Sequence, residues 1–109
     1  RVWLVNTGWL GGQYGTGTRI KLEYTRAMVS AALEGRLNNT HYLKHPIFNL
    51  EMPVMIPGVP SEVLDPRASW TDGAAYDAQA RKLAGMFVQN FAQFETSVSE
   101  AVRNAGPRV

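Results

Sequence analysis

Apolar residues recur on one face of the last long stretch of the chain, which predicts its clearest helix. The stretch runs from about Gly73 to Glu95, and its apolar residues follow one another at intervals of four, three, four, four and three. Such intervals place side chains on one side of an α-helix. The residues of this face are Tyr76, Ala80, Leu83, Phe87, Phe91 and Phe94. We expect the face to form core or a domain-packing surface, and a shorter helix to follow over about Ser97 to Asn104.

The start of the chain combines a short apolar run with a glycine-rich stretch. Residues Val2 to Asn6 read VWLVN, a nearly continuous apolar run that predicts a strand buried on both faces. Five of the ten glycines then fall within residues 6 to 20. Beyond them, apolar and polar residues alternate over residues 20 to 24, which is typical of a brief second strand or of a lead-in to a helix.

From about residue 25 to residue 34 the spacing becomes helical. The residues that share a face are Met28, Ala31 and Ala32. Thr25 is the expected N-cap, because its side-chain oxygen can accept from an amide of the first turn. Gly35 is placed to end the helix in the left-handed conformation.

The middle of the chain is interrupted by prolines. Residues 47 to 60 read IFNLEMPVMIPGVP, with apolar and polar residues roughly alternating. Proline cannot donate a ladder hydrogen bond, so we expect an edge strand followed by a loop along the surface. Pro60 suits the first position of a short helix, and the pair Asp65 and Pro66 should end it.

Composition narrows the function classes. The 109 residues, 45% hydrophobic and 18% charged, allow one domain with a modest core. The net charge is only +2 and the basic residues are scattered, which argues against nucleic-acid binding. No apolar run approaches the roughly eighteen residues of a membrane span, so no membrane partner is expected. The absence of cysteine excludes disulfides and thiolate metal sites and fits a reducing, cytoplasmic compartment.

The first residues suggest how the chain arose. It opens on Arg1 rather than Met and is already strand-like at Val2. Natural domains usually begin with a few loosely held residues, so we expect this chain to be cut from a longer one. The first residues contain no charged segment followed by an apolar region, so no signal peptide is expected.

The glycine-rich stretch fails as a phosphate loop. Gly12 and Gly17 have the separation of G-x-x-x-x-G-K-[ST], but Thr18 and Arg19 follow where Lys and then Ser or Thr should stand. No helix begins at once, so no helix dipole faces an anion. The pattern G-x-G-x-x-G does not fit either. From composition alone, an ordinary flexible turn is the favoured interpretation.

Several motifs in order resemble the C-terminal part of ATP-dependent phosphoenolpyruvate carboxykinase. They are VNTGW, the glycine loop, TRI, TRA at a helix start, HPIFNLEMPVMIPGV, VLDPR, the apolar helix with LAGMFVQNF, and AGPRV at the end. They follow the family's order at close to its spacing and cover nearly the whole chain. The resemblance implies a fold class of α/β: residues 1–109 as the C-terminal part of a mixed α/β, P-loop-bearing nucleotide domain, with short strands followed by helices.

The resemblance also implies an activity. Enzymes of this family convert oxaloacetate and ATP to phosphoenolpyruvate, ADP and carbon dioxide in gluconeogenesis, and they use Mg2+ with the nucleotide and Mn2+ at the substrate. The implied partners are therefore ATP, oxaloacetate and the remainder of the same polypeptide. The family's P-loop, manganese ligands and oxaloacetate-binding arginines have no counterpart among these residues, so no catalytic residue or metal ligand is assigned. We expect the 109 residues alone to be inactive.

By motif match, the loop of residues 6–25 would lie over the base and ribose of ATP. Arg19, Ile20 and Thr25 would be the adenine-side contacts. Their chemistry is compatible, because a guanidinium can stack on a base, an isoleucine can cover one ring face, and a hydroxyl both donates and accepts. Glycines would let the backbone come close to a flat ligand.

Two other functions remain as alternatives. A free-standing nucleotide-binding or protein-interaction module would carry this segment without catalysis, and its apolar helix face could support self-association. A small independent P-loop kinase is disfavoured, because Thr18 and Arg19 replace the residues that such an enzyme needs.

The remaining polar and aromatic candidates favour structural roles. His41 and His45 would stand about 13 Å apart on a strand, so we expect loop or surface histidines rather than a metal pair. Asp65 and Arg67 could be a catalytic acid and an anion clamp, but a turn before proline with a local ion pair is favoured. The tryptophans, at positions 3, 9 and 70, are expected to pack rather than to stack on bases.

Overall fold

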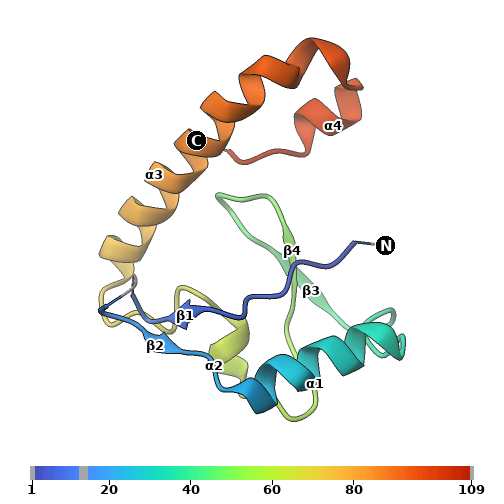
Figure 1. The fold of residues 1–109 in the computed structure, drawn as a ribbon, viewed down its shortest axis with the longest axis vertical. Helices are drawn as coiled ribbons and strands as arrows, with labels where there is room; N and C mark the ends of the chain where they lie inside the picture. Colours follow the sequence, from blue (N-terminus) through green and yellow to red (C-terminus); the bar gives the residue numbers. More distant parts are fainter. Residues whose placement is uncertain (1, 13–14, 109) are drawn as a thin grey trace.

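The computed structural model describes residues 2–12 and 15–108, in which short strand pairs alternate with helices (Figure 1). Strand β1 (Trp9–Leu10) pairs antiparallel with β2 (Thr18–Arg19), and β3 (Tyr42–Lys44) pairs antiparallel with β4 (Glu51–Pro53). The two pairs form separate two-stranded sheets. The helices are α1 (Leu22–Leu33), α2 (Ser61–Leu64), α3 (Gly73–Phe91), the 3-10 helix η1 (Ala92–Ser97) and α4 (Glu100–Asn104). Short strands followed by helices were predicted, and this coarse arrangement is confirmed.

The predicted buried strand over Val2 to Asn6 is wrong. The backbone there is irregular, and the side chains of Val2 and Leu4 are 93% and 80% exposed. A strand needs a neighbouring ladder for its amide and carbonyl groups, and among the described residues none pairs with this segment. The apolar run alone therefore does not make it a strand.

Helix α1 begins three residues earlier than predicted, so Thr25 is not its N-cap. Lys21 holds that position with an extended backbone, and its carbonyl accepts from the amide of Thr25 at 3.3 Å. Glu23 in the first turn compensates the helix dipole where no side-chain cap is present. The segment after β2 is thus a lead-in to the helix rather than a longer strand.

The predicted glycine cap of α1 is confirmed. Gly35 has a φ of 75°, its amide donates to the carbonyl of Ala32, and the amide of Arg36 donates to the carbonyl of Ala31. These two bonds form a Schellman motif, which satisfies carbonyls that the helix end would otherwise leave unpaired. Only a glycine reaches this conformation without steric cost.

The proline-rich segment forms a short strand and a loop, as predicted, but the loop is not entirely at the surface. Ile56 and Val59 form an isolated bridge and are both buried. They pack with Ala31 and Leu37 in a first hydrophobic cluster between the loop and α1. Because the loop folds back on itself, the side chains of Ile56 and Val59 pack toward α1.

Helix α3 starts at Gly73, as predicted, and ends four residues early, passing into η1. Its N-cap is Asp72, whose carboxylate accepts from the amides of Ala74 and Ala75. The second hydrophobic cluster lies on its first half and consists of Ile47, Tyr76, Ala80 and Ala84, with Phe48 and Trp70 beside them. The predicted apolar face is therefore core only in part, because Phe87 is 51% exposed and Leu83 and Phe94 are also exposed.

The molecule is extended for its length. Its radius of gyration is 15.1 Å, whereas a compact domain of this size has about 13 Å. Figure 1 shows why, because α3 projects beyond the strand pairs and carries η1 and α4 at its far end. None of the helices in the described ranges is both long and apolar enough to cross a lipid bilayer.

Candidate functional site

The predicted ligand loop is a tight β-hairpin. Trp9 lies opposite Arg19 and Leu10 opposite Thr18, and the amide of Ile20 extends the ladder by donating to the carbonyl of Gly8 at 2.9 Å. The chain enters through a turn in which the side chain of Asn6 accepts from the amide of Gly8. We call residues 9–19 the nucleotide hairpin, after the ligand that the sequence predicts for them; residues 13 and 14 lie outside the described part of the chain.

The glycines of the nucleotide hairpin are required by its own packing. A Cβ at Gly17 would lie 2.5 Å from the carbonyl oxygen of Gly12 and 2.6 Å from that of Leu10. A Cβ at Gly12 would lie 3.0 Å from the amide nitrogen of Gly17. The two distances at Gly17 are too short for a methyl group, and the one at Gly12 would require the neighbouring backbone to give by a few tenths of an ångström, so both positions favour glycine. This requirement explains these two glycines without any ligand.

The three predicted contact residues fall within residues 19–25, which run from the last residue of β2 into the first turn of α1. Arg19 ends β2 and its side chain is exposed, and Thr25 is half-buried on α1. Ile20 between them is only 7% exposed, so it anchors the segment to the interior. The arrangement offers an exposed cationic side chain and a hydroxyl on either side of an apolar anchor, which suits a flat polar ligand.

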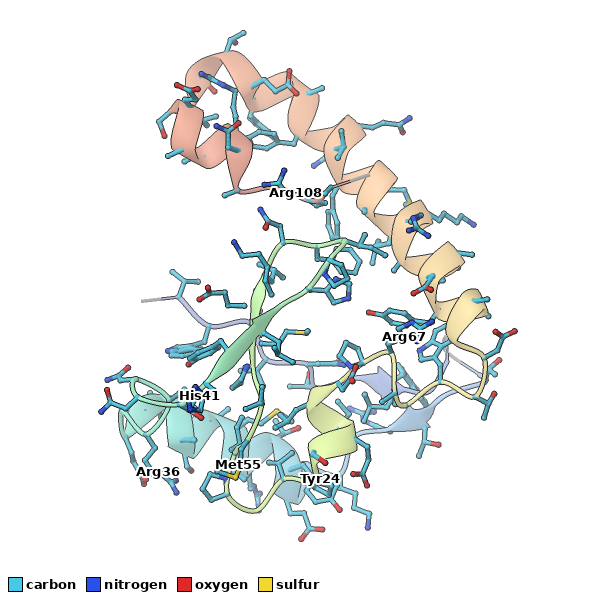
Figure 2. The ribbon with its side chains drawn as sticks, turned by 180° about the vertical axis from the view of Figure 1, so that it is seen from behind. Tyr24, Arg36, His41, Met55, Arg67 and Arg108 are labelled. Carbon is cyan, nitrogen blue, oxygen red and sulfur yellow. The ribbon has the colours of Figure 1, made fainter. Side chains whose placement is uncertain are left out.

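Sequence reasoning did not single out Lys21 and Tyr24, which lie in the same segment. The ammonium nitrogen of Lys21 lies 5.7 Å from the centre of the Tyr24 ring, a cation–π distance. Figure 2 shows Tyr24 at the start of α1. The alternation of apolar and polar residues over positions 20 to 24 is a strand pattern. It does not predict the contact between Lys21 and Tyr24, because that contact forms across the first turn of a helix.

His45 was predicted to be a loop or surface histidine; it lies in the loop after β3, but it is buried rather than at the surface. Its Nδ1 accepts from the amides of Ile47 and Phe48, each at 3.1 Å. Because Nδ1 accepts, Nε2 carries the proton and donates to the hydroxyl of Tyr76 at 2.7 Å. Burial lowers the pKa of His45, opposed in part by the charges of Asp65 and Asp77.

Both ring nitrogens of His45 are thus engaged within the protein, and His41 is exposed. A metal-binding pair of these histidines does not fit this geometry. Within residues 2–12 and 15–108, no three histidine, cysteine or acidic residues gather closely enough to hold a metal ion.

Asp65 forms a turn, as favoured from the sequence, whereas Arg67 pairs with a carboxylate on α3 and not with a neighbour in the sequence. The carboxylate of Asp65 accepts from the amides of Arg67 and Ala68 at 3.1 and 3.3 Å. The guanidinium of Arg67 donates to both carboxylate oxygens of Asp77 on α3, at 3.0 and 3.2 Å. The pair raises the pKa of Arg67 and lowers that of Asp77, chiefly through its hydrogen bonds. Arg67 is therefore occupied rather than free to clamp an anion.

Two of the three tryptophans pack as predicted. Trp70 contacts Tyr76 edge to face with ring centres 5.7 Å apart, and Trp3 stacks on Tyr42 at 6.4 Å. Trp9 lies on the exposed side of β1, opposite Arg19.

A second concavity lies at the other end of the molecule. A groove of about 470 Å³ runs between the end of α3 and the chain around α4, and its apolar lining includes Phe48, Phe87, Phe91, Val102 and Pro107. The end of α3 that lines the groove is the end remote from β1 and β2 in Figure 1. The lining carries few polar groups, so it lacks the arrangement that orients a nucleotide.

Comparison with known proteins gives consistent matches. A family model described as phosphoenolpyruvate carboxykinase matches residues 1–62. Proteins named phosphoenolpyruvate carboxykinase (ATP) from Sinorhizobium medicae, Christiangramia forsetii and Caldanaerobacter subterraneus are 56%, 57% and 56% identical to 96%, 97% and 99% of this chain. The matched part is 20% of each relative, so the chain spans about a fifth of their length.

Proposed function

This chain belongs to the phosphoenolpyruvate carboxykinase family, and we propose that its nucleotide hairpin and the start of α1 form the adenine and ribose side of an ATP site. The observation that carries the proposal is the segment from Arg19 to Thr25. It joins the hairpin to the helix and presents a guanidinium and a hydroxyl on either side of a buried isoleucine. Relatives that are 56% and 57% identical to nearly the whole chain are named phosphoenolpyruvate carboxykinase (ATP).

Each residue of the segment has a distinct proposed role. Arg19 stacks on the base or donates to the sugar, because its side chain is exposed at the end of β2. Thr25 makes a hydrogen bond to the edge of the adenine. Ile20, which is only 7% exposed, fixes the backbone between the two polar residues, so its role is to hold them in place under the base.

The complete protein would then convert oxaloacetate and ATP to phosphoenolpyruvate, ADP and carbon dioxide. The phosphates, the Mg2+ and Mn2+ ions and oxaloacetate would be held by residues outside this 109-residue chain. This division assigns recognition of the base to residues 6–25 and the chemical step to the rest of the polypeptide.

The test is made in the complete protein that carries this sequence. For Arg19→Ala and Thr25→Val we expect the KM for ATP to rise about tenfold, because each change removes about 1.4 kcal/mol of binding. The KM for oxaloacetate should stay within twofold. Arg36→Ala serves as the control, because Arg36 pairs with Glu34 beyond the end of α1. An unchanged KM for ATP in both variants would contradict the proposal.

The 109-residue chain by itself should form no detectable phosphoenolpyruvate. It supplies the base side of the site without the groups that hold the phosphates and metals. A coupled assay of the purified chain with ATP, oxaloacetate, Mg2+ and Mn2+ tests this expectation. Turnover above the background without protein would refute it.

A further inference from the structure

The nucleotide hairpin rests against the loop that precedes α3. Gly11, which follows β1, has a φ of 80°, and a Cβ on it would lie 2.9 Å from the carbonyl oxygen of Ser69. The two backbones are therefore in direct contact, with no room for a side chain between them. Figure 1 shows the loop between α2 and α3 passing beside β1 and β2. We call residues 65–72 the buttress segment.

Internal hydrogen bonds make the buttress segment rigid. Asp65 accepts from two amides at its start, and the hydroxyl of Ser69 donates to the carbonyl of Pro66 at 2.8 Å. The amide of Trp70 donates to the carbonyl of Arg67 at 3.2 Å. At its end, Asp72 caps α3. A segment with this many local bonds keeps one shape and can act as a support.

Arg67 fastens the buttress segment to α3. Its bidentate bond to Asp77 spans the first turn of the helix, and the guanidinium lies directly over Gly73. A Cβ at Gly73 would be 2.6 Å from a guanidinium nitrogen, so glycine is needed for this approach. Figure 2 shows Arg67 at the junction between the loop and the helix. The planar fork of the guanidinium fixes the angle as well as the distance.

We propose that the buttress segment positions the nucleotide hairpin for ATP, with Arg67 as a positioning residue that acts through Asp77 and with Gly11 as the point of contact. This inference rests on the proposed function. Trp9, two residues before Gly11, pairs with Arg19, so a displacement at Gly11 passes through the ladder to the proposed adenine contact. Displacements of about 1 Å in a binding site are enough to cost large factors in catalysis.

The first experiment compares Gly11→Ala with Gly15→Ala in the complete protein. Both glycines have positive φ, at 80° and 92°, so both variants carry similar backbone strain. Of the two, and counting the described residues alone, only Gly11 has a neighbour within 4 Å of the added methyl group. We expect the KM for ATP to rise about tenfold for Gly11→Ala and at most threefold for Gly15→Ala, with kcat and the KM for oxaloacetate within twofold. Equal effects of the two variants would overturn the proposal.

The second experiment removes the ion pair between Arg67 and Asp77. Arg67→Met keeps an apolar stem at this position but loses the guanidinium and with it the ion pair, and we expect a three- to fivefold rise in the KM for ATP with little change in kcat. The double variant with Asp77→Asn should cost no more than Arg67→Met alone, because the two groups act as one unit. Arg36→Met is the control, because it breaks another exposed ion pair, beyond the far end of α1 in Figure 2.

The outcomes separate this inference from the function on which it rests. If Arg67→Met and Gly11→Ala leave the KM for ATP unchanged while Arg19→Ala raises it, the positioning role of the buttress segment is contradicted and the proposed adenine site is supported. If Arg19→Ala and Thr25→Val also leave the KM for ATP unchanged, the proposed adenine site is contradicted, and so is the positioning role that rests on it. A general loss of folding would lower kcat and the melting temperature together, which contradicts a positioning role.

Discussion

Helix α3 carries apolar residues along its whole length, but its first part (residues 73–84, here called the buried half) and its second part (residues 85–91, the exposed half) have opposite surroundings. In the first half, Tyr76, Ala80 and Ala84 are buried, and Ala84 has no exposed surface. In the second half, Met86, Phe87 and Val88 are all exposed. The difference lies in what faces the helix. The first half meets Ile47 and Trp70, whereas the second half borders the groove beside α4.

The comparison teaches that periodicity predicts a face and that a neighbouring segment decides whether the face is buried. The small side chains of Ala80 and Ala84 let the turn after β3 approach the helix closely. Phe48 marks the boundary, because it packs on the second cluster and also contacts Phe87 edge to face at 6.5 Å. Beyond this residue the helix has no equally close partner among the described residues.

The largest expected effect is that of a charge in the buried half. Ala84→Asp should lower the free energy of unfolding of the chain by about 3 kcal/mol or more, because it places an unpaired carboxylate in an apolar contact. Met86→Asp on the exposed side should change it by less than about 0.5 kcal/mol. Urea denaturation followed by circular dichroism measures both. Similar decreases in the free energy of unfolding in the two variants would mean that the two halves of α3 do not differ in burial.

A smaller effect is expected from the polar contact that holds the buried half. Tyr76→Phe keeps the ring and removes the hydroxyl that accepts from Nε2 of His45. The unpaired N–H should cost about 1–2 kcal/mol of unfolding free energy. Tyr24→Phe on α1 is the control, expected within about 0.5 kcal/mol. No difference between these variants would show that the His45 bond contributes nothing to the buried half.

The same contact predicts a pH dependence that the exposed half lacks. Burial lowers the pKa of His45 below its ordinary value of 6.5. The unfolded chain therefore takes up a proton first as the pH falls, so the contribution of His45 is complete above pH 6.5 and declines between 6.5 and the lowered value. Urea midpoints measured across this window should fall in the parent chain and fall less in His45→Gln. A slope that is equal in both would exclude His45 as its source.

The smallest effect on stability is expected in the exposed half. Phe87→Ser should lower the free energy of unfolding by less than about 1 kcal/mol, because the ring is already half exposed. It should instead reduce self-association of the 109-residue chain, since it removes a large apolar group from an open face. Sedimentation velocity at several concentrations tests this, with Ala92→Ser as the control. Unchanged association would indicate that the face does not drive it.

Local chemistry in the sequence was sufficient for some elements. Gly35 ended α1 in the expected conformation, and the prolines limited β4 to three residues followed by a loop. These features depend on one residue and its immediate neighbours. The start of α1 was misplaced because Lys21 caps it without a side-chain bond, which leaves no trace in the residue type.

Features that depend on distant partners could not be predicted. Arg67 bonds to a carboxylate ten residues away, and His45 to a hydroxyl thirty-one residues away. The apolar run from Val2 to Asn6 was predicted as a strand, although no described strand pairs with it. For the candidate site, the motif match selected Arg19, Ile20 and Thr25, but the contact between Gly11 and Ser69 follows only from the backbone path.

The division of the interior into two clusters has a consequence for how the chain opens. The cluster on α1 and the cluster on α3 have no residue in common. Amide hydrogens in the two helices should therefore exchange with solvent through separate openings, each with its own free energy. The nucleotide hairpin leads directly into α1 and touches the loop before α3, so it joins the two opening units. A ligand bound there would slow exchange in both helices at once.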